Sequence, residues 1–210
     1  MQFNKYIDHT LLKPQATEKD INQICNEAKE FEFYAVCVNP CYVSLAKKHL
    51  TGSCVKVACV VGFPLGANTT EIKKIEAKMA INNGADEIDM VINVGKLKEK
   101  KFDYILNEIN EIASLGKVVK VIIETCLLTN EEIIKMCEII NESNALFIKT
   151  STGFGEAGAK KEHIKLMKEH LSANKKIKAS GGIKDKQTFI QMIECGADRI
   201  GTSSGVKLIK

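Results

Sequence analysis

Residues 146–154 read Leu-Phe-Ile-Lys-Thr-Ser-Thr-Gly-Phe, a short apolar run that ends in a polar turn containing glycine. The run has the composition of a β-strand, and Lys149 is its last residue. Alternation along a strand places Lys149 and Phe147 on one face, with Leu146 and Ile148 on the other. If both faces are covered, the Lys149 ammonium points into the protein interior. Burial lowers the pKa of a lysine and favours a usable amine nucleophile.

Strand-like and helix-like segments alternate along the chain on both sides of this run. Apolar runs and turn residues predict eight strands, at residues 6–10, 33–39, 55–61, 87–93, 118–124, 146–149, 177–180 and 199–201. Helices are expected between them, and Thr17, Thr129 and Asp185 stand where N-caps are needed. One of these is a long amphipathic helix after Thr69, with Ile72, Ile75, Ala77, Met79 and Ile81.

Eight strands alternating with helices fit a (β/α)8 or TIM barrel. We predict a compact single-domain barrel of the α/β class over residues 1–210, with a truncated last helix at residues 206–210. A doubly wound open sheet would also accommodate the alternation. The number of units and the lack of a Gly-x-Gly-x-x-Gly turn weigh against it.

Composition narrows the class of protein. A hydrophobic content of 45% in 210 residues can form a substantial core. The net charge of +4 is small and scattered, which argues against nucleic-acid binding. The eight cysteines have neither C-x-x-C spacing nor a metal-ligand spacing with the four histidines, so free thiols in a reducing compartment are expected. No run approaches membrane-spanning length and residues 1–6 have no signal core, so we expect a soluble cytoplasmic protein.

Three charged residues stand at the ends of otherwise apolar strands, namely Asp89, Lys149 and Lys178. Side chains at the C-terminal ends of barrel strands line the active site. Lys149 and Lys178 lie on neighbouring predicted strands, and a nearby cation lowers the pKa of an amine. A neutral amine attacks carbonyls and forms a Schiff base. The alternative is a set of buried ion pairs with no chemistry, because such networks also perturb pKa values.

Lys120 and Glu124 share a predicted strand face. They are either a structural pair or an outer part of the site. By residue type, nothing distinguishes Lys120 from Lys149, and the loop that follows Lys149 favours the latter.

Two glycine-containing loops point to a phosphate. Ser180-Gly181-Gly182 follows the seventh strand, and residues 201–205, Gly-Thr-Ser-Ser-Gly, follow the eighth. The loops at these two positions often bind phosphate through backbone amides and hydroxyls. Both loops together predict a phosphorylated substrate.

Motifs from one end of the chain to the other resemble the deoxyribose-phosphate aldolase family. They are residues 8–12, 37–40, 61–66, 87–91, 120–125, 147–154, 178–183 and 201–205. The resemblance implies reversible cleavage of 2-deoxy-D-ribose 5-phosphate to D-glyceraldehyde 3-phosphate and acetaldehyde, without a metal or an organic cofactor. It implies a small phosphorylated sugar and acetaldehyde as partners.

The resemblance also implies roles for individual residues. Lys149 would form the Schiff base, and Asp89 would move protons through water. Lys178 would lower the pKa of Lys149, keep Asp89 ionised and take part in proton transfer. The phosphate would bind at Gly153, Gly181, Gly182, Ser203 and Ser204. Thr152 and Cys37 match positions near the site, and for Cys37 an inert buried thiol is favoured over a reactive one.

Two departures from the family pattern matter. Some members carry a basic residue where this chain has Phe154, so phosphate would rely on amides and hydroxyls. Some also extend into a C-terminal tail with a tyrosine, for which this sequence has no counterpart after Lys210. A homodimer is compatible with such a barrel. Two other functions remain open: a different Schiff-base enzyme of transaldolase type, and a non-catalytic barrel that binds a sugar phosphate.

Overall fold

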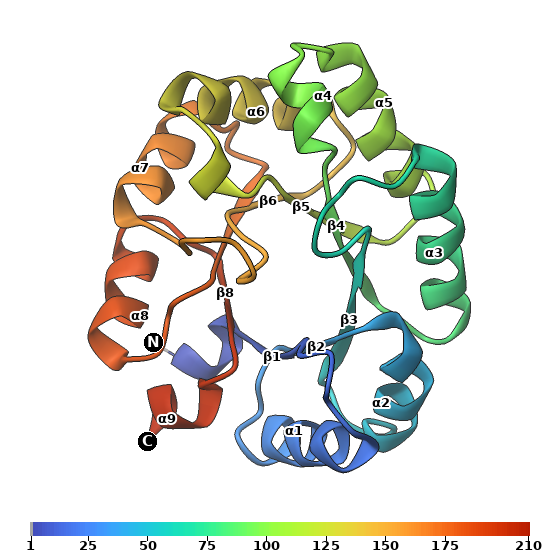
Figure 1. Cartoon of the computed structure of the whole chain (residues 1–210). Helices are drawn as coiled ribbons and strands as arrows, with labels where there is room; N and C mark the ends of the chain where they lie inside the picture. Colours follow the sequence, from blue (N-terminus) through green and yellow to red (C-terminus); the bar gives the residue numbers. More distant parts are fainter. Residues whose placement is uncertain (1) are drawn as a thin grey trace.

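The computed structural model describes residues 2–210 as a closed barrel of parallel strands surrounded by helices (Figure 1). The strands pair in sequence order, and β1 closes the barrel against β8 with Asp8 opposite Gly201. The strands are β1 Ile7–Leu11, β2 Ala35–Val38, β3 Lys56–Val61, β4 Glu87–Val91, β5 Val118–Ile122, β6 Phe147–Lys149, β7 Lys176–Ser180 and β8 Arg199–Thr202. The predicted barrel is confirmed.

The helices follow the strands around the outside of the barrel. They are α1 Glu18–Glu30, α2 Val43–His49, α3 Thr70–Asn82, α4 Val94–Lys98, α5 Phe102–Ala113, α6 Asn130–Glu142, α7 Lys161–His170, α8 Lys186–Glu194 and α9 Gly205–Ile209. Short 3-10 turns are η1 Phe3–Tyr6, η2 Pro40–Tyr42 and η3 Thr125–Leu127. Thr17 and Thr129 form capping boxes, and Asp185 accepts from the Thr188 amide, as predicted. Helix α9 is short, which agrees with the predicted truncated last helix. Among the helices of residues 2–210, none combines the length and the apolar character needed to cross a membrane.

The fifth strand is shorter than predicted. It ends at Ile122, and Glu124 adopts a left-handed backbone conformation with φ 53° and ψ 67°. The residues on either side still bond to the neighbouring strand, because the Ile123 amide donates to Lys149 O and the Thr125 amide to Thr150 O. The turn at Glu124 removes its side chain from the face that holds Lys120. The predicted shared face of these two residues is therefore wrong.

The predicted helix after Thr69 is present as α3, but most of its large apolar residues do not face the barrel. Ile72, Ile75 and Met79 are more than half exposed. The residues that face the barrel are Thr70, Lys73, Ala77 and Ala80. They recur at helical spacing, and the buried Lys73 ammonium pairs with Glu108 of α5 at 2.6 Å and donates to Val91 O at 2.8 Å. A buried ion pair therefore contributes to the packing of α3 against α5.

The barrel has an apolar shell and a mixed interior. The main hydrophobic cluster lies between the strands and the surrounding helices. Inside the barrel, a small cluster of Leu12, Cys37, Ala58 and Val60 packs with Phe63 on the side of β2 and β3. Buried charged side chains come from β1, β4, β5, β6, β7 and β8. The interior therefore offers charge on one side and small apolar groups on the other.

Candidate active site

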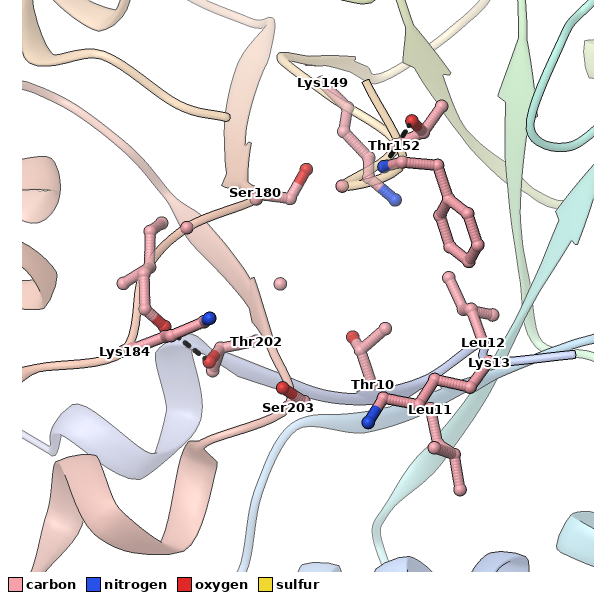
Figure 2. Close-up of a pocket in the computed structure, with 16 residues that line it drawn as sticks. Thr10, Leu11, Leu12, Lys13, Lys149, Thr152, Ser180, Lys184, Thr202 and Ser203 are labelled. Carbon is pink, nitrogen blue, oxygen red and sulfur yellow. Dashed lines mark hydrogen bonds between the residues drawn. The ribbon is translucent and has the colours of Figure 1, made fainter. Parts of the chain in front are cut away.

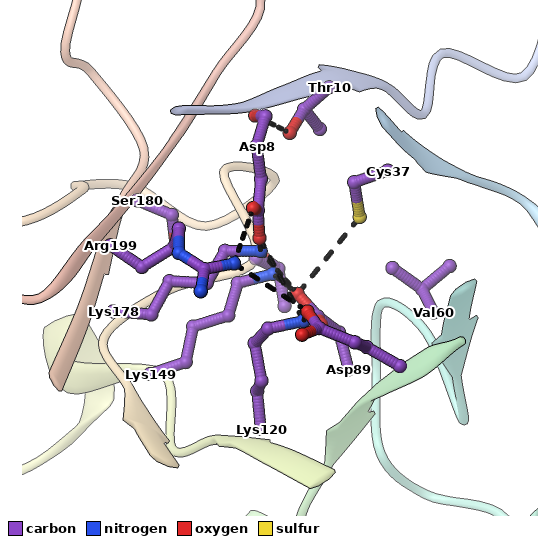
Figure 3. A network of polar contacts seen from close by, with 12 residues as sticks. Asp8, Thr10, Cys37, Val60, Asp89, Lys120, Lys149, Lys178, Ser180 and Arg199 are labelled. Atoms are coloured by element: carbon purple, nitrogen blue, oxygen red, sulfur yellow. Dashed lines mark hydrogen bonds and ion pairs between the residues drawn. The ribbon is translucent and has the colours of Figure 1, made fainter. Parts of the chain in front are cut away.

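Lys149, Asp89 and Lys178 meet inside the barrel (Figure 3). Lys149 and Lys178 stand opposite each other on β6 and β7. Their ammonium nitrogens lie 2.7 Å and 2.8 Å from the same carboxylate oxygen, Oδ2 of Asp89. All three residues are at most 2% exposed. The structure thus brings together the three residues to which the sequence assigned catalytic roles.

A second set of charges lies next to these three. Lys120, opposite Asp89 on the neighbouring strand, donates to Asp89 Oδ1 at 2.8 Å. Lys178 also donates to Asp8, whose other oxygen accepts from Arg199 at 3.0 Å. Each inner carboxylate therefore has at least two cationic neighbours.

Glu87 completes the network below Asp89 on β4. Its Oε2 lies 2.5 Å from Lys120 Nζ and 3.6 Å from Arg199, as an ion pair without hydrogen-bond geometry. The Arg199 guanidinium also lies over the Tyr34 ring, 3.3 Å from its centroid. Such a cation–π contact adds to the stabilisation of a buried guanidinium.

Lys149 differs from the other lysines of this network in its pKa. Burial lowers the pKa of Lys149, and the ammonium of Lys178 lowers it further, although the Asp89 carboxylate opposes both. Burial also lowers the pKa of Lys178 and of Lys120, but nearby carboxylates outweigh this effect and raise both pKa values. The strongest of these carboxylates is Asp8 for Lys178 and Asp89 for Lys120. Lys149 is therefore the lysine poised to lose its proton.

Asp89 and Asp8 stay ionised. Burial by itself would raise the pKa of Asp89, but Lys120, Lys149 and Lys178 outweigh it and hold that pKa well below its usual range. The same balance lowers the pKa of Asp8, where Lys178 is the strongest of the cations. An ionised Asp89 can accept a proton from a group that reacts at Lys149.

A cavity of about 190 Å³ opens above this network (Figure 2). Among the charged residues described so far, Lys149 is the one that lines it within residues 2–210. Asp89 and Lys178 are fully buried beneath the cavity floor. Leu11, Leu12 and Ile183 supply apolar walls. A carbonyl compound in this cavity would reach the amine, and Asp89 would act from behind it.

The end of the cavity away from Lys149 is formed by the predicted phosphate loops. Gly181, Gly182 and Ser203 are among the lining residues, while Thr152, which precedes Gly153, lies beside Lys149 in Figure 2. The three glycines have φ between 78° and 84°, a conformation that glycine adopts without strain.

The loop after β6 and the loop after β7 pack closely on each other. A Cβ at Gly158 would lie 2.1 Å from Gly181 O, so the loops after β6 and β7 leave no room for a side chain there.

Ser204 and Cys37 are placed differently from the predicted lining. Ser204 lies next to the cavity as the N-cap of α9, and its amide donates to Thr202 Oγ1 at 3.0 Å. Cys37 is fully buried among small apolar residues, with its Sγ 4.0 Å from Asp89 Oδ2. Burial raises the pKa of the Cys37 thiol, and Asp89 adds to this. Within residues 2–210, neither residue belongs to the cavity wall.

Two lysines line the cavity that the sequence analysis did not single out. Lys13 follows β1, Lys184 follows β7, and both are exposed. In Figure 2 they lie at the end that holds Thr202 and Ser203, away from Lys149. The sequence could have indicated them, since Lys13 comes two residues and Lys184 four residues after the end of a barrel strand.

Glu124 acts on the loop after β6, and it does not pair with Lys120. Its carboxylate accepts from the Thr152 hydroxyl and from the Thr152 amide, at 3.3–3.4 Å for the amide. Thr152 Oγ1 in turn accepts from the Phe154 amide at 3.0 Å. This chain of bonds fixes the turn that carries Gly153.

Phe154 occupies the position where some related sequences have a cation. Its ring is half exposed and makes an edge contact with Phe63, with centroids 5.3 Å apart. Phe154 therefore adds an apolar edge to the cavity, and any positive charge for an anion comes from Lys13 and Lys184.

Asp8, Glu87 and Arg199 are network residues that the sequence analysis did not assign to the site. Strand alternation could have indicated them, because each lies on the same face of its strand as a residue that points inward. No cluster of three or more His, Cys, Asp or Glu side chains suited to a metal ion occurs within residues 2–210.

Known proteins share this arrangement of chain and fold. Residues 3–208 match the DeoC/LacD family of aldolases. The deoxyribose-phosphate aldolase of Finegoldia magna is 58% identical over 212 aligned residues, which span all of both chains. The solved aldolase QR15 superposes with a TM-score of 0.94 at 48% identity and covers 98% of this chain and 93% of its own. The deoxyribose phosphate aldolase of Aeropyrum pernix, described as a unique tetramer, has a TM-score of 0.92 at 31% identity, with 99% and 89% covered.

Proposed function

The chain belongs to the DeoC/LacD family of aldolases, and from this premise we propose that it cleaves 2-deoxy-D-ribose 5-phosphate reversibly to D-glyceraldehyde 3-phosphate and acetaldehyde. One observation carries the proposal. The Lys149 amine reaches a cavity whose opposite end has glycine turns, a serine hydroxyl and two lysines. That arrangement suits a short chain with a carbonyl at one end and a phosphate at the other.

Lys149 begins the reaction as a neutral amine. Its Nζ attacks C1 of the open-chain sugar, and loss of water from the carbinolamine gives an iminium. The iminium withdraws the electrons of the C2–C3 bond when the C3 hydroxyl loses its proton, which releases glyceraldehyde 3-phosphate. The remaining enamine takes a proton at C2, and water then hydrolyses the new iminium to acetaldehyde and the free amine.

Asp89 and Lys178 handle the protons of these steps. Asp89 lies 2.7 Å from Lys149 Nζ, which supports its role as the base that works through a water molecule. Lys178 shares the same Asp89 oxygen at 2.8 Å. It keeps Asp89 ionised, lowers the pKa of Lys149 and can return a proton.

The phosphate binds between the loops after β6, β7, β8 and β1. Gly153, Gly181, Gly182 and Ser203 contribute amides and a hydroxyl, and Ser204 supports the same loop from outside the lining. Lys13 and Lys184 supply the positive charge that Phe154 does not.

We also propose that residues 1–210 form a single domain. We further propose that the protein is cytoplasmic and that two copies of it form a homodimer. The buried thiols of Cys25, Cys59 and Cys137 suit a reducing compartment. The exposed apolar residues of α3 offer a surface for a second copy of the chain. Light scattering of the purified protein measures this, and a monomer at micromolar concentration would contradict it.

Borohydride trapping tests the proposed activity. Acetaldehyde is incubated with the enzyme, the iminium is reduced, and the modified residue is mapped by mass spectrometry. We expect an ethyl adduct on Lys149 and none in Lys149→Leu. The matched control is Lys117→Leu, which removes an exposed lysine and should leave trapping unchanged.

The compound that forms an adduct on Lys149 distinguishes the proposed aldolase from a transaldolase-type enzyme and from a non-catalytic sugar-phosphate-binding barrel. A transaldolase-type enzyme would form its adduct from a ketose phosphate instead of acetaldehyde and pass that ketone fragment to an aldose phosphate, and a binding protein would give no adduct. Either result would contradict the proposal.

A further inference from the structure

The interior of the barrel carries an uneven number of charges. Among residues 2–210, the cationic side chains of the network are Lys120, Lys149, Lys178 and Arg199, and the carboxylates are Asp8, Glu87 and Asp89. Each of these residues is at most 6% exposed, so water screens their charges weakly. With every group ionised the network has one surplus positive charge. With Lys149 neutral, it has none.

The surplus charge falls on Lys149 because this lysine is the least compensated cation. Lys120 lies close to Glu87 and Asp89, and Lys178 contacts Asp8 and Asp89.

Within residues 2–210, Lys149 has a single carboxylate neighbour, Asp89, and it shares one oxygen of Asp89 with Lys178. Arg199 has two carboxylate neighbours and the ring of Tyr34. The other titratable group that faces Lys149 is the thiol of Cys37 on β2, which is neutral, and β3 contributes apolar residues. Deprotonation of Lys149 therefore neutralises the whole interior.

We propose that Arg199 and Glu87 are positioning residues that set the neutral fraction of the Lys149 amine by fixing the charge of the network. Within the described part of the chain, neither forms an ion pair with Lys149 and neither lines the cavity. The inference rests on the proposed Schiff-base function and extends it to two residues at the opposite end of the barrel interior.

The two residues act with opposite signs. Removing the charge of Arg199 leaves three cations and three carboxylates, so the network is neutral with Lys149 protonated, and the pKa of Lys149 rises. Removing the charge of Glu87 leaves two surplus positive charges, and the pKa of Lys149 falls. A single buried charge about 10 Å away shifts a pKa by about one unit at an effective dielectric constant of about 20. At a pH below the pKa of Lys149, a shift of that size changes the neutral fraction of the amine about tenfold.

The test uses Arg199→Met, Glu87→Gln and the double variant. The acid limb of kcat/KM against pH reports the amine of the free enzyme. We expect this limb to move up by about one pH unit in Arg199→Met and down by about one in Glu87→Gln. The double variant has the same surplus as the native chain, so its limb should return to the native position.

The double variant separates charge from structure. If both residues merely support the fold, the two substitutions together impair the enzyme more, and the limb does not return. Limbs that move in the same direction, or stay in place while rates fall, would overturn the inference. Arg199→Lys, which keeps the charge, is the matched control and should leave the limb in place.

A second measurement keeps the test valid if a variant is unstable. The pH dependence of acetaldehyde trapping on Lys149 needs the amine alone and is compared among variants that give native circular dichroism. Should the native protein show no trapping, the proposed function fails. Should it trap normally while Glu87→Gln leaves the pH dependence unchanged, the charge inference alone fails.

Discussion

Replacing Lys178 with methionine should slow the enzyme at neutral pH by keeping Lys149 protonated. The nitrogens of Lys178 and Lys149 lie 2.8 Å and 2.7 Å from the same oxygen of Asp89, so they are close neighbours. Two unit charges about 5 Å apart repel by about 3 kcal/mol at an effective dielectric constant of about 20, which corresponds to about two pKa units. The pKa of Lys149 should therefore rise by about two units in the variant.

The assay is the pH profile of kcat/KM for deoxyribose phosphate. Below its pKa, the neutral fraction of the Lys149 amine falls tenfold per unit, so the rate at pH 7 should drop by about 100-fold. Part of this loss should be recovered at alkaline pH, where the amine is neutral in both proteins. Loss of proton transfer by Lys178 would add a decrease that pH does not recover.

Two controls accompany this measurement. Lys178→Arg keeps the positive charge and should shift the acid limb much less than Lys178→Met. Removing one partner of a buried ion pair costs about 3–5 kcal/mol of stability, so thermal unfolding must show that Lys178→Met is folded at the assay temperature. An acid limb that stays in place, or moves to lower pH, in folded Lys178→Met would refute the electrostatic role of Lys178.

Three further predictions concern the phosphate end, the loop after β6 and the outer shell. Lys13→Met and Lys184→Met should each raise KM for deoxyribose 5-phosphate by about tenfold, the value of one charge-assisted hydrogen bond. Cleavage of unphosphorylated deoxyribose should be unchanged; a parallel loss on both substrates would count against a phosphate contact. Glu124→Gln weakens the bonds that hold the turn around Gly153 and should raise KM more than it lowers kcat, so an unaffected KM would contradict this role. Glu108→Ala leaves the Lys73 ammonium buried without its partner and should lower the free energy of unfolding by about 3–5 kcal/mol in urea. The double variant with Lys73→Met and Glu108→Leu, which removes both charges, should lower the free energy of unfolding much less.

The barrel and the three central side chains could be predicted from local patterns. Strand and helix periodicities are properties of short segments, and eight alternations leave few topologies. The C-terminal ends of parallel strands meet at one end of a barrel, so Asp89, Lys149 and Lys178 had to approach each other. Their approach follows from the topology and needs no side-chain detail.

Tertiary contacts decide what the local patterns could not. Glu124 fits a strand by its neighbours, but its carboxylate binds Thr152 and its backbone turns to reach it. Helix α3 has apolar residues on one face, yet it buries the face with Lys73 because Glu108 of another helix lies there. In both cases the deciding partner is distant in sequence. A helical or strand period cannot reveal such a partner.

The electrostatics that keep Lys149 neutral also make its iminium reactive. An iminium at Lys149 returns one positive charge to an interior that is balanced without it, so the same neighbours that lower the pKa of the amine destabilise the cation. Conversion of the iminium to a neutral enamine removes the positive charge from this nitrogen, and that conversion is the step that breaks the carbon–carbon bond. A second carboxylate beside Lys149 would hold the iminium more firmly and slow its cleavage. The single carboxylate of Asp89, shared with Lys178, therefore suits both the formation of the adduct and its breakdown.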